Sequence, residues 1–358
     1  MKILVGLSGG VDSSMAAYML KKAGHEVYGA TMSIWDKNAF MKSVAGKDAC
    51  FSPHEEKDIE EAKKLCARLD IPYYVFDCTE QYRKLVLENF KSEYLAGRTP
   101  NPCVICNSTI KFAALPETAR KEGLVFDKFA TGHYARVEFD EQTGRYQLKA
   151  ALHNQKDQSY FLYRLSQEQL SKIMMPLGEY KKEEIRQMAR EAGLEVHDKP
   201  DSQDFYSGDI NDILQADPKP GNFVDTQGHV LGKHNGIWHY TVGQRKGLGI
   251  SAEQPLYVLS LRPDTNEVVL GFLDESMKEA LIAKDMVWSG IAAPQKSLKC
   301  KAKIRSAQPA TPVEVIPLAD GKVRVKFENL QKAIAPGQSV VLYDNDLVLG
   351  GGFIESAE

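Results

Sequence analysis

The chain opens with an apolar run that passes through a glycine-rich turn into a helical run. Lys2 to Leu7 (KILVGL) is predicted to be a buried strand, and Ser13 to Ala23 has the apolar spacing of a helix. Strand and helix patterns keep alternating over residues 1–205. This alternation is typical of a parallel sheet whose crossover helices cover both faces. We therefore predict an α/β fold for the first part of the chain.

The rest of the chain has a different character. After Asp209 glycine and proline become frequent and helical periodicity fades, and from Ala283 short alternating strands dominate. Short strands at this spacing suggest a small β-barrel. We predict three domains, which are an α/β domain at 1–205, a small central α+β, β-rich domain at 206–280 and a C-terminal β-barrel at 281–358. In the first domain we expect strands at Glu26–Ile34, Pro72–Phe76 and Phe126–Thr131, and helices at Glu55–Leu69, Glu80–Leu95, Ile110–Lys121 and Lys181–Ala192.

Composition limits where such a protein works. With 43% hydrophobic and 26% charged residues and a net charge of −3, the chain resembles an ordinary globular protein. We see no apolar run near the ~20 residues that span a bilayer, and no leader pattern before the first strand. We therefore expect a cytoplasmic protein that does not associate with membranes. Six cysteines are too few for a disulfide scaffold, so closely spaced ones are candidate metal ligands or reactive thiols.

The turn after the first strand has the features of a phosphate-binding loop. Ser8-Gly9-Gly10-Val11-Asp12-Ser13 places backbone N–H groups and hydroxyl donors at the start of a helix. Asp12 is a poor neighbour for phosphate unless a cation lies between them, so we assign it to Mg²⁺. A glycine-rich turn without a ligand is the alternative. The run resembles the pyrophosphate loop (S-G-G-x-D-S) of ATP pyrophosphatases, and Ala30–Met32 and Ala130–Tyr134 suit an adenine and ribose pocket.

A second segment contains a pair of cysteines suited to sulfur chemistry. Gly97 to Asn107 (GRTPNPCVICN) holds Cys103 and Cys106 in a Cys-x-x-Cys pair, in a loop that we expect to stay extended until a helix begins near Thr109. A thiol near a helix N-terminus and basic groups has a lowered pKa, so we expect a reactive thiolate here. Half of a structural zinc site is the alternative, but no second cysteine or histidine pair completes it.

Six blocks in order give the chain a family resemblance. They are GLSGGVDSS, AGRTPNPCVICN with IKF, ATGHYAR, KDQSYFLYRLS, HYTVGQRKGLGI and APGQSVVLYDNDLVLGGGFI. The chain resembles the tRNA-specific 2-thiouridylases (MnmA family), and the blocks run almost end to end. The resemblance implies an N-terminal domain of the adenine nucleotide alpha hydrolase type, ATP and Mg²⁺ as cofactors, and tRNA as partner. It also implies a sulfur donor, such as a cysteine desulfurase, a relay protein or free sulfide.

The resemblance also assigns residues to roles. Cys106 matches the family's nucleophile, and Asn101, Pro102 and Cys103 fall where the family approaches the flipped base. Positions matching the ATP site are Gly6, Leu7, Ser8, Gly9, Gly10, Val11, Asp12, Ser13, Met32 and Gly132. Positions matching tRNA contacts are His133, Lys156, Asp157, Gln158, Arg305 and Gln338.

One departure from the family changes the sulfur route. Many relatives carry a second cysteine in a D-S-x-x-I-C-F block, but Tyr206 stands at that position here. A phenol cannot carry transferable sulfur, so we expect Cys50, Cys103 and Cys106 to converge on one site. They could hold a [4Fe–4S] cluster, which we favour slightly, or Cys106 could carry a persulfide that Cys103 or Cys50 resolves. A third interpretation is that Cys50 is an incidental thiol that takes no part in the site.

The predicted barrel offers a surface for RNA. Lys299, Lys301, Lys303 and Arg305 alternate along one strand, and Lys322, Arg324 and Lys326 along another, so each set shares a sheet face. An ordinary solvated strand face is the alternative.

The resemblance implies that the 2-oxygen of the wobble uridine attacks the α-phosphate of ATP, and that sulfur then displaces AMP to give 2-thiouridine. One competing function is an ATP-dependent synthetase or amidotransferase-type enzyme that acts on a small molecule, which would need neither the thiol pair nor a basic barrel. The other is a noncatalytic RNA-binding protein, which would not need an intact loop.

Overall fold

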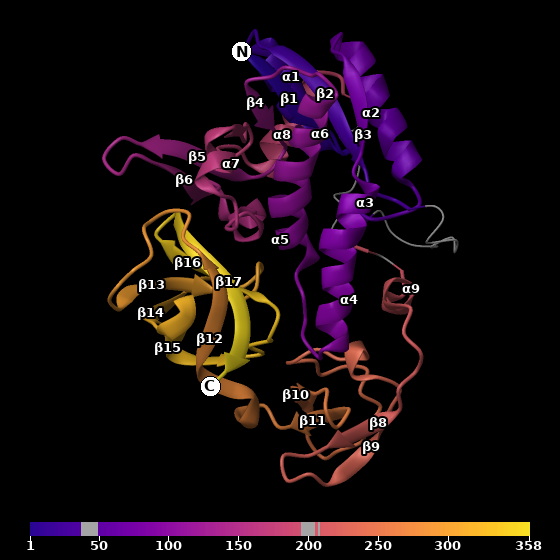
Figure 1. The fold of residues 1–358 in the computed structure, drawn as a ribbon, viewed down its shortest axis with the longest axis vertical. Helices are drawn as coiled ribbons and strands as arrows, with labels where there is room; N and C mark the ends of the chain where they lie inside the picture. Colours follow the sequence, from indigo (N-terminus) through magenta and orange to yellow (C-terminus); the bar gives the residue numbers. More distant parts are fainter. Residues whose placement is uncertain (37–48, 195–204, 207) are drawn as a thin grey trace. The chain divides into compact units, whose positions relative to one another are not determined.

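The computed structural model describes residues 1–36, 49–194, 205–206 and 208–358, and the chain forms two compact units. The first unit contains residues 1–86, 102–209 and 346–348, and the second contains 87–101, 210–345 and 349–358 (Figure 1). The chain therefore passes between the units several times. Each unit is described by itself.

The first unit is built on a parallel sheet. Its strand order is β3 (Tyr73–Asp77), β2 (Glu26–Ser33), β1 (Lys2–Gly6), β4 (Lys128–Ala130) and β7 (Ile173–Met174), and the neighbouring strands are parallel. The central strand β1 has strands on both sides and buries Ile3, Leu4 and Val5 completely. The predicted parallel sheet is confirmed.

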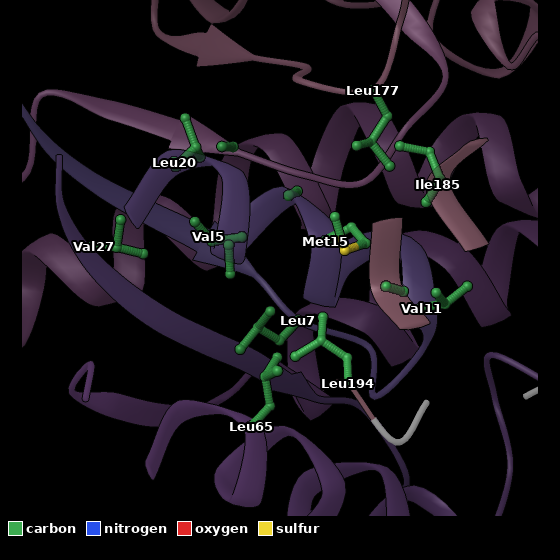
Figure 2. Packing of buried hydrophobic residues seen from close by; sticks show 14 of the residues in the cluster. Val5, Leu7, Val11, Met15, Leu20, Val27, Leu65, Leu177, Ile185 and Leu194 are labelled. Carbon is green, nitrogen blue, oxygen red and sulfur yellow. The ribbon is translucent and has the colours of Figure 1, made fainter. Parts of the chain in front are cut away.

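Helices from distant parts of the sequence share the core of this unit. They are α1 (Val11–Lys22), α2 (Glu55–Leu69) and α8 (Lys182–Glu191). Figure 2 shows side chains of β1, α1, α2 and α8 in one apolar cluster, including Val5, Met15, Leu65 and Ile185. Packing through this cluster fixes α8 against α1, which matters for the site described below.

Two long helical stretches each contain a π-helical segment. The first consists of α3 (Thr79–Tyr82), η1 (Arg83–Leu87) and α4 (Glu88–Leu95), and the second of α5 (Pro102–Cys106), η2 (Asn107–Ala114) and α6 (Leu115–Lys121). The expected helix start near Thr109 was wrong, because the helix already begins at Pro102, a residue whose fixed φ and missing N–H suit a first helical position. Cys103 and Cys106 therefore lie on the helix and not in an extended loop.

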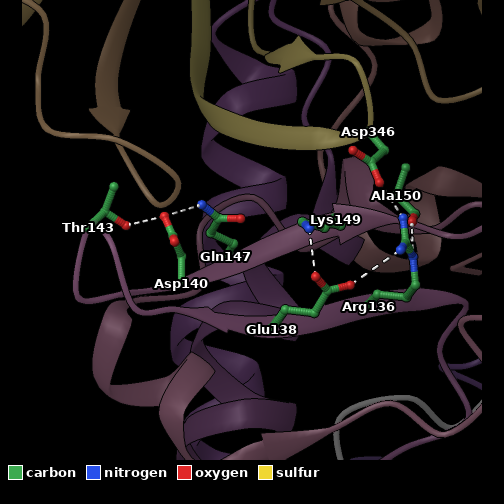
Figure 3. A network of polar contacts seen from close by, with 8 residues as sticks. All are labelled: Arg136, Glu138, Asp140, Thr143, Gln147, Lys149, Ala150 and Asp346. Carbon is green, nitrogen blue, oxygen red and sulfur yellow. Dashed lines mark hydrogen bonds and ion pairs between the residues drawn. The ribbon is translucent and has the colours of Figure 1, made fainter.

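An antiparallel hairpin in the first unit was not expected from the sequence. It consists of β5 (Ala135–Asp140) and β6 (Arg145–Ala150). Arg136 forms ion pairs with Glu138 and Asp346, and Lys149 Nζ lies 2.6 Å from Glu138 (Figure 3). The remaining short elements of this unit are η3 (Asn154–Lys156), η4 (Ser159–Phe161) and α7 (Gln167–Ser171).

The second unit contains two β-structures. A four-stranded sheet has the order β10 (Tyr257–Arg262), β11 (Glu267–Gly271), β8 (Gly221–Val224) and β9 (Val230–His234), preceded by α9 (Ile210–Leu214). The strands β12 (Met277–Val287), β15 (Val323–Lys332), β14 (Thr311–Pro317), β13 (Leu298–Lys303), β16 (Ser339–Asp344) and β17 (Leu347–Ala357) follow one another, and β17 pairs with β12. This closes a six-stranded barrel, and the predicted C-terminal β-barrel is confirmed. Single 3₁₀ turns lie at η6 (Ile237–His239), η7 (Asp274–Ser276) and η8 (Ala319–Gly321).

Within the described part of the chain, the helices are all too short or too polar to span a bilayer.

The central strand provides a stability test. Leu4→Ala should lower the free energy of unfolding of the first unit by about 2–5 kcal/mol, because Leu4 is fully buried and the cavity cannot be filled by its neighbours on a strand paired on both sides. Urea unfolding measures this change. Leu152→Ala is the matched control, since Leu152 is 59% exposed in the same unit, and an equal loss in both variants would contradict the packing described here.

Candidate active site

The loop after β1 is held open for an anion by its own residues. Gly9 has a φ of +68°, and a Cβ there would lie 2.9 Å from the backbone oxygen of Asp58. The Ser13 hydroxyl donates to the carbonyl of Gly10 at 3.1 Å and accepts from the amide of Ser8 at 3.2 Å. The loop thus leads into the N-terminus of α1, where backbone N–H groups and the helix dipole favour a negative charge.

The segment after β4 touches this loop closely. A Cβ on Gly132 would lie 2.6 Å from the backbone of both Asp12 and Ser13, so a larger residue cannot occupy position 132 without displacing the loop. Tyr134, two residues later, donates its hydroxyl to Asp12 Oδ1 at 2.8 Å. The structure therefore brings Gly132 together with the loop, although the two are far apart in the sequence.

The end of β2 also reaches the loop. Thr31 donates its hydroxyl to the carbonyl of Leu7 at 2.9 Å and accepts from the Tyr73 hydroxyl at 2.7 Å. Met32 follows it and is half-buried. The candidate nucleotide-binding residues thus come from the ends of three neighbouring parallel strands.

A lysine that the sequence did not point to completes the surroundings of the loop. Lys182 Nζ lies 2.7 Å from each carboxylate oxygen of Asp12. The two residues are separated by 170 positions, and a lysine in the first turn of an amphipathic helix is commonly a surface residue. No sequence signal marks Lys182; only the packing of α8 against α1 places it here.

The two clustered thiols lie at the start of the helix that continues into η2. Cys103 and Cys106 are both partly exposed, and Cys50 is exposed. Tyr82 is fully buried, which raises the pKa of its phenol well above the usual value, and the charges of Cys106, Cys50 and Cys103 act in the same direction. Tyr82 is thus a common neighbour through which the three thiols can be compared, but their convergence on one site stays a prediction.

The segment that carries Cys50 contacts Phe205 and Tyr206 through its neighbour Phe51. The amide of Phe51 donates to the carbonyl of Phe205 at 3.0 Å, and the Phe51 ring lies 6.0 Å from the Phe205 ring and 6.1 Å from the Tyr206 ring. Phe51 also stacks on Tyr82 at 5.4 Å. Cys50 is thus the sequence neighbour of a residue that packs against Phe205 and Tyr206. The rest of that sequence block, at 201–204, lies outside the described residues.

The protonation of Cys106 differs from expectation. Burial raises the pKa of the Cys106 thiol to about 12, which outweighs the lowering by the positive charge of Lys111. This direction is opposite to the lowered pKa that the sequence led us to expect, because the charge of Lys111 is too weak to offset the desolvation of the sulfur. Lys111 is the fifth residue after Cys106, and the π-helical spacing of η2 favours contact between such residues.

Residues 131–133 connect the loop to the thiol helix. Gly132 touches the loop, as described above, and His133 lies 5.6 Å from the Phe112 ring of η2. Burial, with the nearby charge of Lys111, lowers the pKa of His133 well below its usual value, and its Nδ1 lies 2.8 Å from the Thr131 hydroxyl. His133 is therefore neutral near pH 7, and a single shared cavity for the loop and the thiols stays a prediction.

Several residues expected to contact tRNA make local bonds. Asp157 accepts from the amides of Ala151 and Ser159 at 3.1 Å each, and Gln158 Oε1 accepts from the amide of Tyr134 at 2.9 Å. Lys156 is exposed. Gln158 thus holds the segment that follows Gly132, which is a structural role that the sequence did not indicate.

The second unit contains the remaining candidates. Gln338 is buried, and its amide donates to the carbonyls of Thr99 and Pro100 at 2.9 and 3.1 Å. Arg305 is half-buried, and its charge counteracts the rise that burial causes in the pKa of Tyr94. Asn101 ends the loop that Gln338 holds. Gln338 therefore fixes the backbone that leads to Pro102.

The effect of Lys111 on the thiol can be measured. Lys111→Gln should slow alkylation of Cys106 by iodoacetamide between pH 7 and 10, by about tenfold for each unit that the thiol pKa rises, because the thiolate becomes scarcer. Peptide mass spectrometry reports the alkylation of Cys106 separately. Lys84→Gln is the control, since Lys84 is exposed on η1. Equal alkylation rates in the wild type and the Lys111 variant would contradict this charge effect.

Fold and site together define an α/β nucleotide-binding enzyme of the pyrophosphate-loop class with a thiol group nearby. Family models match residues 1–206 as "tRNA methyl transferase HUP domain", 210–272 as "tRNA methyl transferase PRC-barrel domain" and 278–354 as "Aminomethyltransferase beta-barrel domain". The tRNA-specific 2-thiouridylase MnmA of Endomicrobium trichonymphae is 51% identical over 356 residues, covering 99% of each chain. The protein of the same name from Clostridium botulinum (strain Alaska E43) is 46% identical over 99% of this chain and 98% of its own.

The chain belongs to the tRNA-specific 2-thiouridylase (MnmA) family. Among solved structures, NMN synthetase from Francisella tularensis matches with a TM-score of 0.33 and 16% identity, over 56% of this chain and 65% of that one. So distant a likeness has no bearing on the activity.

Proposed function

We propose that this chain is an ATP-dependent tRNA sulfurtransferase that converts the wobble uridine of tRNA to 2-thiouridine. The observation that supports this most directly is within the first unit. Residues 131–134 contact the phosphate-type loop through Gly132 and Tyr134, and the helix of Cys106 through His133. Family membership and the thiol group both fit this activity, whereas a small-molecule synthetase would have no use for the thiols.

The first step that we propose is adenylation. The uridine 2-oxygen bonds to the α-phosphorus of ATP, the bond from that phosphorus to the bridging oxygen breaks, and pyrophosphate leaves with the electron pair while the N3 proton passes to solvent. The ATP-binding residues would be Gly6 to Ser13, Met32 and Gly132. The glycine backbone and the helix N-terminus suit the phosphates, because their amides are fixed before ATP arrives.

The fit of Mg²⁺ rests on Asp12. Its carboxylate is a hard oxygen ligand of the kind that Mg²⁺ prefers, and it is 27% exposed, although both oxygens contact Lys182. Mg²⁺ at this position would neutralise charge on the departing pyrophosphate. Asp12 would then hold two cations in one place.

The sulfur step that we propose runs through Cys106. A persulfide donor gives its outer sulfur to Cys106, and that sulfur attacks C2 of the adenylated uridine while AMP leaves. A second thiol, Cys50 or Cys103, then attacks the Cys106 sulfur, which releases 2-thiouridine and leaves a disulfide for a dithiol reductant to open. The contacts of Phe51, the neighbour of Cys50, with Phe205 and Tyr206 support Cys50 as the substitute for the family's second cysteine.

An iron–sulfur cluster fits the described side chains less well. No group of three or more His, Cys, Asp or Glu in the described parts of the chain is placed to hold a metal ion. Cys50, Cys103 and Cys106 would therefore have to move together before a [4Fe–4S] cluster could bind. We favour the persulfide route for this reason, with a cysteine desulfurase or a relay protein as the persulfide donor, whereas free sulfide would suit only the cluster route. The cytoplasmic location stays a prediction.

The barrel surface is less basic than the sequence suggested. Glu314 on β14 lies opposite Lys299 of β13 on one side and Lys326 of β15 on the other. Lys322 pairs with Glu355 at 2.8 Å, and Arg324 with Glu358 at 2.7 Å. Lys299 and Lys301 of β13 are exposed, whereas the paired Lys322 and Arg324 are half-buried. We therefore propose that Lys299 and Lys301, despite Glu314 opposite Lys299, are the better candidates for binding the tRNA backbone.

The sulfur route is tested by single substitutions. Cys106→Ser should abolish thiolation but leave tRNA-dependent pyrophosphate release, because adenylation precedes sulfur transfer. Cys50→Ser should reduce multiple-turnover thiolation at least tenfold while one turnover from a preformed persulfide proceeds, with the tRNA held as a mixed disulfide. Full activity of Cys50→Ser would exclude Cys50, and Cys300→Ser is the control, since Cys300 lies in the barrel. Stoichiometric iron after anaerobic purification, lost in Cys50→Ser, would instead establish the cluster.

The RNA surface is tested through salt dependence. Replacing Lys299 and Lys301 by Gln should reduce the slope of log K for tRNA against log salt by up to about 1.4–1.8, since each lost phosphate contact removes about 0.7–0.9. Filter binding between 50 and 200 mM salt, about the usual range, measures this slope. The matched control replaces Lys322 and Arg324 by Gln, because these side chains already pair with carboxylates. The same slope in all three proteins would contradict the assignment.

A further inference from the structure

A buried ammonium group lies at the phosphate-type loop. Lys182 is 6% exposed, and its Nζ contacts both carboxylate oxygens of Asp12 at 2.7 Å. The same nitrogen lies 5.9 Å from the centre of the Tyr134 ring. Burial of a lysine is costly unless the charge is paired, so a lysine in this position has to be held by specific partners.

The position of Lys182 is fixed from both sides. It is the first residue of α8, whose first turn is capped by Glu184, which accepts from the amide of Lys181 at 2.7 Å. The same helix packs its Ile185 into the core beside α1 (Figure 2). On the other side Tyr134 donates to Asp12 Oδ1 at 2.8 Å. Asp12 is therefore oriented by the Tyr134 hydroxyl and the Lys182 ammonium. Lys182 is in turn held by α8 and by the Asp12 carboxylate.

The charge balance of the loop gives this arrangement a function. The loop has no lysine of its own, unlike the Gly-Lys-Ser/Thr loops that bind phosphates. A carboxylate at Asp12 would repel the phosphates of ATP unless a cation stood beside it. The chain supplies that cation itself, from a helix far along the sequence.

We propose that Lys182 is a catalytic residue of adenylation, which hydrogen-bonds the pyrophosphate oxygens as the bond to the α-phosphorus breaks. Asp12 and Tyr134 are its positioning residues. In this proposal the ammonium stabilises the leaving group by its charge. This proposal rests on the proposed placement of the ATP phosphates at residues 8–13. A buried ion pair that only joins α8 to α1 is the competing explanation.

The first experiment separates catalysis from binding and folding. Lys182→Met should slow tRNA-dependent pyrophosphate release in a single turnover by about 10²–10³-fold, the usual effect of removing one such donor, while the Kd for ATP rises less than about tenfold. Lys182→Arg should retain more of the rate, because it keeps the charge. Lys181→Met is the matched control, since Lys181 is the exposed neighbour. The double variant Asp12→Asn with Lys182→Met has no unpaired charge and shows whether the unit folds without the ion pair; its rate does not report on Lys182, because the proposed Mg²⁺ ligand is lost as well.

The second experiment measures the dependence of the rate on the leaving group, which a purely structural role of Lys182 would not change. ATP analogues with CF₂ or CH₂ between the β- and γ-phosphates release a less or a more basic leaving group. If Lys182 stabilises that group, the ratio of the CF₂ rate to the CH₂ rate should increase at least threefold in Lys182→Met. An unchanged ratio, with both rates lowered equally, would overturn the proposal. If instead the proposed placement of ATP at residues 8–13 is wrong, the result would be different. Ser13→Ala would then leave the Kd for ATP unaltered.

Discussion

The close approach of Gly132 to the backbone of Asp12 and Ser13 is the contact on which the rest of the site depends. It has no room for a side chain, so it holds the end of β4 directly against the start of α1. Tyr134 and His133 then follow on fixed backbone, one toward the loop and the other toward the helix of Cys106. A single glycine thereby sets the spacing between the loop of residues 8–13 and the helix of Cys103 and Cys106 within one unit.

Much of the fold followed from the sequence because its signals are local. The strands of the parallel sheet, the loop after β1 and the helix Glu55–Leu69 each have a pattern that lies in contiguous residues. The helix α2 has the same bounds as the predicted helix. The barrel strands were also foreseen from period-two alternation. The hairpin β5–β6 was missed, since its charged residues conceal the alternation and its ion pairs form only on folding (Figure 3).

The site was predictable only in part, for the same reason. The loop and the Cys-x-x-Cys pair are short motifs, but the approach of Lys182 to Asp12 depends on how two helices pack. The helix start at Pro102 was missed because the prolines suggested an extended loop. The pKa of Cys106 depends on how deeply the folded chain covers the sulfur, which a motif cannot report. The contact of Phe51 with Phe205 joins two segments that share no pattern.

The buried amide of Gln338 gives the C-terminal barrel a second duty. By holding the carbonyls of Thr99 and Pro100, it shapes the peptide that delivers the chain to Pro102 and hence to the first turn of the thiol helix. A homologue that lost or exchanged this module would have to hold the peptide before Pro102 with another donor.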